Sequence, residues 1–226
     1  MPEIPKTIHI SLHAIDEYPL SSSDWDYLSD EEVTRATHYK FPEDQNRFVI
    51  ARSLLKQALS KMSHQDPKHI KFSYGKYGKP RLSDPGLDDL HFNLSHSENL
   101  IGIVISNTHP VGIDLQKIKP LSYLNKLVSR YCSNEEQLYL KTRHPDEQLP
   151  LFYKLWCQKE GISKALGMGI QFGFKTIDLN PELYSQSISI PNPGDCLKSQ
   201  EKCLNVHSCL LTVPDDYCAA LSWIDH

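Results

Sequence analysis

The sequence predicts an α+β protein whose coarse pattern permits a division into two lobes. Three observations support this prediction. Helical and strand-like periodicities are segregated along the chain, each half contains helices and a small sheet, and the composition shifts near residues 117–120. We place the lobes at residues 1–116 and 117–226, although no repeated stretch of sequence between them is evident by eye.

Length and composition exclude several classes of protein. A chain of 226 residues can form one large domain or two smaller ones, and 39% hydrophobic with 23% charged residues is typical of a globular protein. No apolar run approaches the ~18 residues of a membrane span and no signal peptide is visible, so we expect a cytoplasmic protein. A net charge of -4 favours no general binding to nucleic acid or membranes, so any phosphate site must be local.

The six cysteines lie in the second half of the chain and form no C-x-x-C pair, so the zinc-site spacing is absent. We expect reduced thiols, because no export signal is visible. Cys203, His207 and Cys209 could hold a metal in principle, but in a strand-like segment we favour a packing role for them.

The first lobe is predicted to begin with a strand at residues 7–15, where apolar and polar residues alternate. Residues 21–24 supply helix-capping side chains, and residues 47–62 have the apolar spacing of a helix. Further strands are predicted at residues 70–73, 90–94, 100–105 and 111–115, with the turn-rich segment GKYGKP at 75–80.

The second lobe is predicted to begin with three helices, at residues 121–130, 133–142 and 147–166. Ser133 and Glu136 have the spacing of a capping box, and Gly167 and Gly169 end the third helix. Four strands follow in the prediction, at residues 174–179, 186–190, 206–213 and 217–224.

Asp114 is the first candidate for a functional residue. It lies at the end of an apolar strand, and Gly112 beside it allows another backbone or a ligand to approach closely. A carboxylate in this place can bind a hard cation. Taken alone, however, Asp114 could equally cap the turn before Lys117.

The segment WCQKEGISK forms a second cluster, with polar side chains on one broad face of the predicted third helix: Trp156, Lys159, Glu160, Ser163 and Lys164. Glu160 and Lys164 could form only a surface salt bridge, which is worth a few tenths of a kcal/mol. Gly161 argues against a simple surface salt bridge. Glycine costs about 1 kcal/mol within a helix relative to alanine, so its presence indicates that another part of the protein or a ligand approaches this face closely.

The third cluster is Ser95, His96 and Ser97, which we predict to follow a strand and open a turn. Hydroxyls, an imidazole and backbone N–H groups can bind one phosphate there. A Ser-His hydrolase is disfavoured because the G-x-S-x-G elbow is missing. The GKYGKP segment lacks P-loop spacing, but Lys79 can still supply a point charge for phosphate.

In this order, the motifs G-K-P, F-N-x-S-H-S, G-I-D and W-x-x-K-E-x-x-x-K resemble those of the Sfp-type 4′-phosphopantetheinyl transferases. The resemblance implies a monomer of two similar α+β halves with coenzyme A (CoA) bound in the cleft. It also implies an activity, transfer of 4′-phosphopantetheine from CoA to a serine of an apo acyl or peptidyl carrier protein, with release of 3′,5′-ADP.

The same resemblance implies roles for individual residues. Asp114 and Glu160 would bind Mg²⁺ on the CoA pyrophosphate, Glu160 would also accept the serine proton, and Lys164 and His96 would stabilise phosphate charge. Contacts to CoA would come from Arg47, Lys79, Pro80, Ser95, His96 and Lys164, with Arg35 as a further candidate. Trp156 would anchor the catalytic helix, and Lys159 would be a supporting charge.

Gln116 departs from the family pattern, in which many members have an acidic residue at this position. A third carboxylate ligand is therefore missing, and we expect weaker Mg²⁺ binding or tolerance of Mn²⁺. Gly161 is a smaller departure, because alanine or serine is common there in the family.

Two other functions remain open, a CoA-binding protein without transferase activity and a metal-dependent phosphohydrolase. Retention of both Asp114 and Glu160 argues against the first of these. For the carrier protein we expect a docking surface within residues 117–131, although an ordinary amphipathic helix packed inward would have the same pattern.

Overall fold

The computed structural model of the chain describes residues 2–169, 173–192 and 203–225. The first half contains strands β1 (Ile8–Ala14), β2 (Phe72–Tyr74), β3 (Pro80–Leu82), β4 (His91–Ser97) and β5 (Leu100–Ser106), and helices α1 (Ser22–Asp26), α2 (Asp30–Thr37) and α3 (Pro42–Ser63). The second half contains β6 (Val111–Lys117), α4 (Leu124–Tyr131), α5 (Asn134–Lys141), α6 (Pro145–Leu166), β7 (Ser185–Pro191), β8 (Cys203–Leu210) and β9 (Tyr217–Ile224). The predicted α+β class is confirmed.

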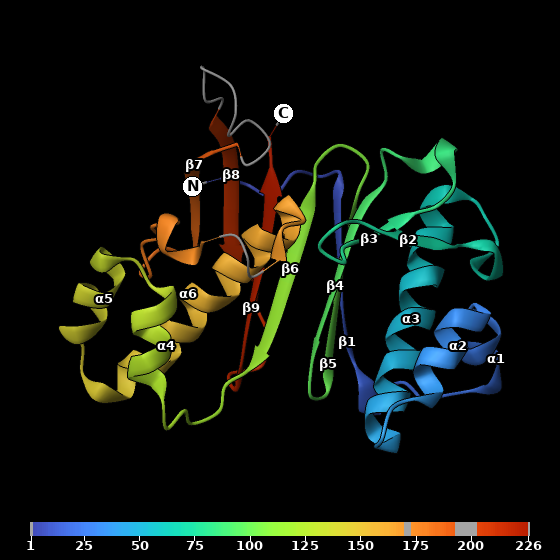
Figure 1. Cartoon of the computed structure of the whole chain (residues 1–226), viewed down its shortest axis with the longest axis horizontal. Helices are drawn as coiled ribbons and strands as arrows, with labels where there is room; N and C mark the ends of the chain where they lie inside the picture. Colours follow the sequence, from blue (N-terminus) through green and yellow to red (C-terminus); the bar gives the residue numbers. More distant parts are fainter. Residues whose placement is uncertain (1, 170–172, 193–202, 226) are drawn as a thin grey trace.

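The molecule has four layers, which are seen edge-on in Figure 1. Two antiparallel sheets, β1-β5-β4 and β6-β9-β8-β7, lie in the middle, with α3 outside the first sheet and α6 outside the second. A small hairpin of β2 and β3 flanks the first sheet. The sheets meet through a shared apolar core that includes Val104, Ile113 and Leu221.

The central strand β5 shows why this layering follows from the sequence. Its side chains alternate between the two faces, so Ile101, Ile103 and Ile105 pack beneath α3 while Val104 packs against the second sheet. All seven residues of the strand are buried. A strand covered on both faces has a continuous apolar run in place of an alternating pattern.

The two halves contain a short internal repeat that inspection of the sequence had missed. The segments Tyr27–Glu32 and Tyr131–Glu136 read YLSDEE and YCSNEE, and each forms a capping box at the start of an eight-residue helix, α2 or α5. A 22-residue helix that begins with proline follows in both cases. The repeated helix pairs support the predicted similarity of the two lobes.

Two local predictions were wrong. Residues 174–179 form no strand; a 3₁₀ turn, η5 (Phe174–Thr176), occurs there, and the apolar side chains Phe174, Ile177 and Leu179 are buried without strand pairing. Ser95, His96 and Ser97 do not open a turn but are the last three residues of β4. The lobe boundary at residues 116 and 117 falls within β6 and stays a prediction.

Other predictions concern the cysteines and the membrane. All five cysteines within the described ranges are free thiols, and Cys196 lies outside those ranges. The His207 ring contacts Ser187 and Asp225, each at 2.7 Å, and in the described part of the chain no group of three potential metal ligands occurs. No helix among the described residues has the length and apolar character needed to cross a membrane.

Candidate active site

The candidate site lies where β4 of the first sheet meets β6 of the second, and we call this contact the joint between the halves. β6 pairs with β9 along one edge, and its other edge faces β4. Side-chain oxygens of β4 accept hydrogen bonds from backbone N–H groups of β6: Asn93 from Ile113 (2.9 Å), Ser95 from Leu115 (3.2 Å) and Ser97 from Lys117 (2.9 Å). Alternate residues on both strands therefore form a side-chain ladder, because every second residue of a strand points the same way.

Two glycines bring α6 against this strand. A Cβ atom on Gly112 of β6 would lie 2.1 Å from the carbonyl oxygen of Gly161 and 2.4 Å from the backbone nitrogen of Ala165, so only glycine fits. A Cβ atom on Gly161 would in turn lie 2.9 Å from Ser222 Oγ of β9. The close approach predicted from Gly161 is thus confirmed, and its partner is the second sheet.

This contact places Asp114 of β6 beside Lys164 of α6. Asp114 is 2% exposed, and its carboxylate accepts hydrogen bonds from Lys164 Nζ (2.6 Å), Ser95 Oγ (3.2 Å) and Gln116 Nε2 (3.1 Å). Lys164 Nζ also donates to Ser95 Oγ and to the Ile113 carbonyl, both at 3.1 Å. The ammonium therefore joins β4, β6 and α6.

Glu160 lies one helical turn before Lys164 and is 9% exposed. Burial and the negative charge of Asp114 raise the pKa of Glu160 to about 7, while the positive charge of Lys164 opposes this shift. Near neutral pH the side chain can therefore either hold or accept a proton. Two carboxylates with a single ammonium nearby can accommodate a further cation.

His96 is exposed on the face of β4 opposite to Ser95. Although the ring reaches solvent, the protein around it removes part of its hydration. This desolvation, followed by the positive charges of Arg47 and Lys164, lowers the pKa of the His96 imidazole. Arg35 adds to this effect, and Asp44 opposes it. Side chains from α2, α3 and α6 thus create a locally positive region around this imidazole, as a binding site for an anion requires.

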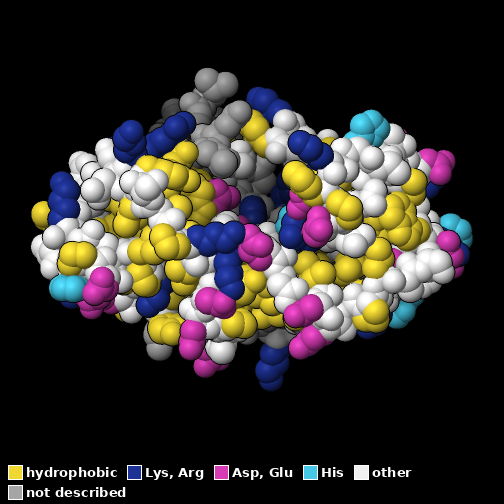
Figure 2. Space-filling view, turned by 90° about the horizontal axis from the view of Figure 1, so that it is seen from below, with side chains coloured by type: hydrophobic (Ala, Val, Ile, Leu, Met, Phe, Trp, Pro, Cys, Tyr) yellow, Lys and Arg dark blue, Asp and Glu magenta, His cyan; other side chains and the backbone are white. Residues whose placement is uncertain are grey.

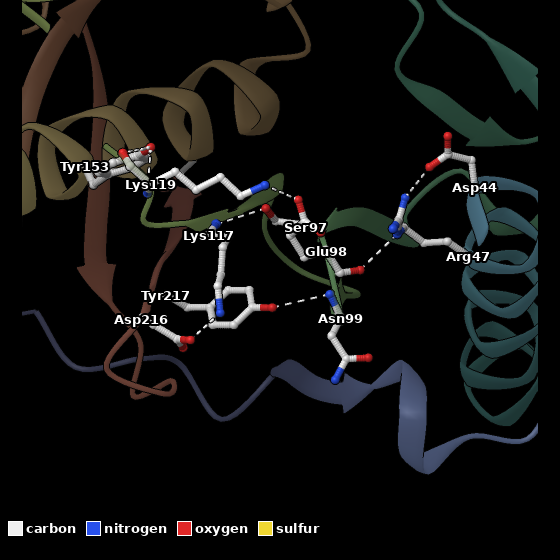
Figure 3. A network of polar contacts seen from close by, with 10 residues as sticks. All are labelled: Asp44, Arg47, Ser97, Glu98, Asn99, Lys117, Lys119, Tyr153, Asp216 and Tyr217. Carbon is white, nitrogen blue, oxygen red and sulfur yellow. Dashed lines mark hydrogen bonds and ion pairs between the residues drawn. The ribbon is translucent and has the colours of Figure 1, made fainter. Parts of the chain in front are cut away.

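Arg47 of α3 is held in place at one end of this region (Figure 3). Its Nε donates to the carbonyl of Glu98 (2.9 Å), and a terminal nitrogen pairs with Asp44 (2.5 Å). Glu98 adopts a left-handed conformation (φ 49°) in the turn between β4 and β5, and its carboxylate pairs with Lys119 after β6. These contacts connect the first half of the chain to the second.

Lys79 and Pro80 lie at the other end of the joint, in the wall of a cavity of about 1420 Å³ between the two halves. Lys79 Nζ donates to the carbonyls of Val111 and Ala165, both at 3.1 Å. Burial, followed by the nearby charge of Arg81, lowers the pKa of Lys79 to about 8. Figure 2 shows a hollow between the two halves with dark blue Lys or Arg side chains in its wall.

Comparison with known proteins identifies the family. A profile described as 4′-phosphopantetheinyl transferase superfamily matches residues 110–222, and one described as 4′-phosphopantetheinyl transferase, N-terminal, matches residues 21–108. The chain belongs to the 4′-phosphopantetheinyl transferase superfamily. The predicted family and class of enzyme, a transferase of the 4′-phosphopantetheinyl group, are therefore confirmed.

Individual relatives of this transferase cover most of its length. The 4′-phosphopantetheinyl transferase HetI of Nostoc sp. (strain PCC 7120 / SAG 25.82 / UTEX 2576) is 34% identical over 194 residues, which are 85% of this chain and 76% of HetI. The 4′-phosphopantetheinyl transferase Sfp of Bacillus subtilis (strain 168) is 32% identical over 167 residues, which are 74% of this chain and 72% of Sfp.

The transferase brings five of the predicted site residues into one cluster: Ser95, Asp114, Gln116, Glu160 and Lys164. His96 and Arg47 lie beside this cluster, whereas Lys79 and Pro80 line the cavity. Lys159, which was predicted to share the face of Glu160, instead contacts Glu136 of α5. Trp156 packs edge-on against Tyr131, with ring centroids 4.9 Å apart.

Three residues of this transferase site received no role in the sequence analysis: Asn93, Asp44 and Glu98. Asn93 carries a signal that could have revealed it, since with Ser95 and Ser97 it places a polar side chain at every second position of a strand. Asp44 could have been found by its i,i+3 spacing from Arg47 on the predicted helix. Glu98 contributes chiefly a backbone carbonyl, for which the sequence holds no signal.

Proposed function

We propose that the site transfers 4′-phosphopantetheine from CoA to a serine hydroxyl of an apo acyl or peptidyl carrier protein, and that Asp114 and Glu160 bind the Mg²⁺ ion that this reaction needs. The observation that carries the proposal is the pair of buried carboxylates beside Lys164. Burial, followed by the charge of Asp114, raises the pKa of Glu160 to about 7, so a bound cation would favour the charged form of this carboxylate. A structural salt bridge alone would need only one of these carboxylates.

The available ligands suit Mg²⁺. This ion prefers oxygen ligands in octahedral geometry, usually one or two carboxylates completed by phosphate and water oxygens. Asp114 and Glu160 supply the carboxylates, and Gln116 can supply an amide oxygen. Because Gln116 is neutral and its amide N–H group already binds Asp114, we expect weaker Mg²⁺ binding or tolerance of Mn²⁺. When bound, the ion would neutralise charge on the pyrophosphate oxygens of CoA.

The protein's own side chains have distinct tasks in the proposed reaction. The serine oxygen forms a bond to the β-phosphorus of CoA, the bond to the 3′,5′-ADP oxygen breaks, and the serine proton passes to Glu160, directly or through a water molecule. Lys164 and His96 stabilise the charge on the phosphate oxygens. Lys164 keeps its ammonium beside Asp114 for this purpose.

CoA would be held along the joint between the halves. We assign the adenosine phosphate end to Arg47, with Arg35 nearby, and the other phosphates to Ser95, His96 and Lys79. Lys79 has three N–H donors, and the carbonyls of Val111 and Ala165 take two of them. Pro80 would shape the adenine pocket.

The carrier protein would dock on residues 117–131, beside the site. In this segment Leu121, Leu124 and Leu127 pack against the core of the second half, which leaves Tyr123, 52% exposed, as the apolar side chain offered to a partner. The resemblance to the Sfp-type family further implies a monomer, and we propose that it works in the cytoplasm. Size-exclusion chromatography with light scattering would test the monomer.

Mass spectrometry of an apo carrier protein after incubation with the enzyme, CoA and Mg²⁺ tests the proposal. We expect a gain of one phosphopantetheine, lost with Asp114→Ala and with Glu160→Ala. Release of free phosphopantetheine without an adduct would instead identify a phosphohydrolase. Binding of CoA without either product, for several carrier proteins, would identify a CoA-binding protein.

A further inference from the structure

Lys159 is the residue of the W-x-x-K-E-x-x-x-K motif that the proposed reaction leaves without a task. Its side chain is 2% exposed, and its ammonium donates to three acceptors: Glu136 Oε2 (2.5 Å), the Phe174 carbonyl (2.8 Å) and the Tyr131 carbonyl (3.2 Å). An ammonium has three donors, so each of them is used. Lys159 therefore connects α6 to the end of α4, to α5 and to η5.

Glu136 completes the anchor from the other side. Its side chain is fully buried and accepts hydrogen bonds from the backbone N–H groups of Ser133 (2.8 Å) and Leu179 (2.9 Å) in addition to Lys159. Four hydrogen bonds to the backbone thus hold one buried ion pair. A buried pair with this many partners is rigid, because losing any contact leaves a polar group unsatisfied.

The first half contains the same arrangement at matching positions. Lys56 is residue 15 of α3, as Lys159 is of α6, and it pairs with Glu32 of the other capping box at 2.7 Å. Lys56 also donates to the carbonyl of Tyr27, the counterpart of Tyr131 in the repeated segment (2.8 Å). The pair therefore recurs in the two halves with the same helix and capping-box context.

The copies differ in the next residue along each helix, and Glu32 also has a second partner, Arg52, at 3.5 Å. Lys56 is followed by Gln57, which bonds Ser53 and Tyr18, whereas Lys159 is followed by Glu160. Neighbouring residues of a helix point about 100° apart, so one rotation of α6 about its axis moves both side chains. At about 6 Å from the axis, a rotation of about 10° displaces a side chain by about 1 Å.

The contact between Gly112 and Gly161 limits the distance of α6 from β6, but it does not by itself limit rotation, since neither residue has a side chain. Lys164 binds Asp114 on the β6 side of the helix, and the ion pair of Lys159 holds the opposite side, so the two together restrict rotation. We propose that Lys159 is a positioning residue that fixes the rotation of α6 and so holds Glu160 opposite Asp114. This inference rests on the proposed function, in which Glu160 binds the metal ion.

The test compares two double variants, Lys159→Met/Glu136→Gln and its matched control Lys56→Met/Glu32→Gln. Changing both partners leaves neither member of the lysine–glutamate pair as an unpaired buried charge, and glutamine keeps an acceptor for the capping box. In the control Arg52, which lies 3.5 Å from Glu32, also loses its carboxylate partner, so the control is at least as disruptive to charge contacts as the test variant. Mn²⁺ affinity in the presence of CoA is measured by electron paramagnetic resonance, kcat by carrier modification, and folding by thermal melting.

We expect the Lys159 double variant to bind Mn²⁺ at least about fivefold more weakly and to lose about 10- to 100-fold in kcat, because small displacements of reacting groups are costly. The Lys56 double variant should keep both values within about twofold, with a similar change in melting temperature. Unchanged Mn²⁺ affinity and kcat in the Lys159 variant, or equal losses in both variants, would overturn the inference.

Glu136→Asp is the second variant, for the case that the Lys159 double variant does not fold. It keeps both charges and moves one carboxylate by a methylene, so α6 must shift for the pair to persist. Weaker Mn²⁺ binding is expected, and wild-type affinity in a folded Glu136→Asp protein would overturn the inference. A wild-type protein that neither binds Mn²⁺ with CoA nor modifies carriers would instead refute the proposed function, and the inference with it.

Discussion

Lys164 of α6 places its ammonium nitrogen 2.6 Å from a carboxylate oxygen of Asp114 on β6. The pair joins the helix that carries Glu160 to the strand that meets the first half of the molecule. Because Ser95 of β4 also bonds to both residues, this one ammonium links the two sheets at the site. Four predictions follow from this geometry and its surroundings.

Lys164→Met should lower kcat/KM for carrier modification by about 100-fold or more, because it removes the charge that we propose stabilises phosphate oxygens. The matched control is Lys154→Met on the same helix. Its ammonium lies over the Tyr184 ring, and it precedes Lys164 by ten residues, or about 15 Å along the helix. This control should stay within about twofold of wild type. A Lys164→Met enzyme that is equally active would contradict the proposed role.

Glu160→Gln should stabilise the metal-free protein at alkaline pH. The folded protein keeps the Glu160 proton up to about pH 7, whereas an ordinary glutamate loses it near 4.5. Between these pH values the folded state binds more protons than the unfolded state, so the free energy of unfolding falls as pH rises. Above about pH 7 the folded protein bears the whole cost of a buried, charged Glu160. Glutamine removes this penalty.

For that variant we expect a gain of about 3 kcal/mol at about pH 8 and under about 1 kcal/mol at about pH 5. Urea unfolding in the presence of EDTA at the two pH values provides the measurement. A gain that does not depend on pH would show that Glu160 has an ordinary pKa.

Gly112→Ala should destabilise the protein by about 3 kcal/mol or more, because the added methyl group would meet the backbone of α6 and neither element can yield alone. Gly75→Ala is the control, since its Cβ atom would meet nothing closer than 3.7 Å, and it should change the free energy of unfolding by no more than about 0.5 kcal/mol. Urea denaturation compares the two, and similar curves would disprove the close contact.

Gln116→Glu should strengthen metal binding about three- to tenfold, because a third carboxylate joins Asp114 and Glu160. It should also destabilise the metal-free protein, since the amide N–H bond to Asp114 is replaced by repulsion between like charges. Mg²⁺-dependent activity and melting temperature in EDTA measure the two effects. If the variant bound Mg²⁺ and Mn²⁺ with the same affinities as the wild type, the proposed effect of Gln116 on metal binding would be contradicted.

The long helices and the sheet strands were predictable because their signals are local. Residues 47–62 and 147–166 have helical apolar spacing, and they lie within α3 and α6. The capping box of Ser133 and Glu136 is formed as predicted. In these segments the secondary structure depends mainly on residues within a few positions of each other, so it can be predicted from a single sequence.

Contacts between distant segments were not predictable. Asn93 and Ile113 are 20 positions apart in the sequence. Nothing in either segment indicates that the backbone N–H group of Ile113 binds the side-chain oxygen of Asn93, and not the backbone of a neighbouring strand. Residues 174–179 have the apolar content of a strand, yet the edge of the sheet is taken by β7. The role of Lys159 was similarly hidden, because its partner Glu136 lies on another helix.

The side-chain ladder on β6 has a consequence for the behaviour of the chain during synthesis and storage. An uncovered strand edge in the middle of a molecule offers N–H and C=O groups to any other extended chain, which promotes aggregation. Here Asn93, Ser95 and Ser97 occupy the N–H groups, while Lys79 and Lys164 occupy carbonyls of Val111 and Ile113. The two lysines that we propose to act in the site thus also protect an edge, so replacing both should make the protein prone to self-association as well as inactive.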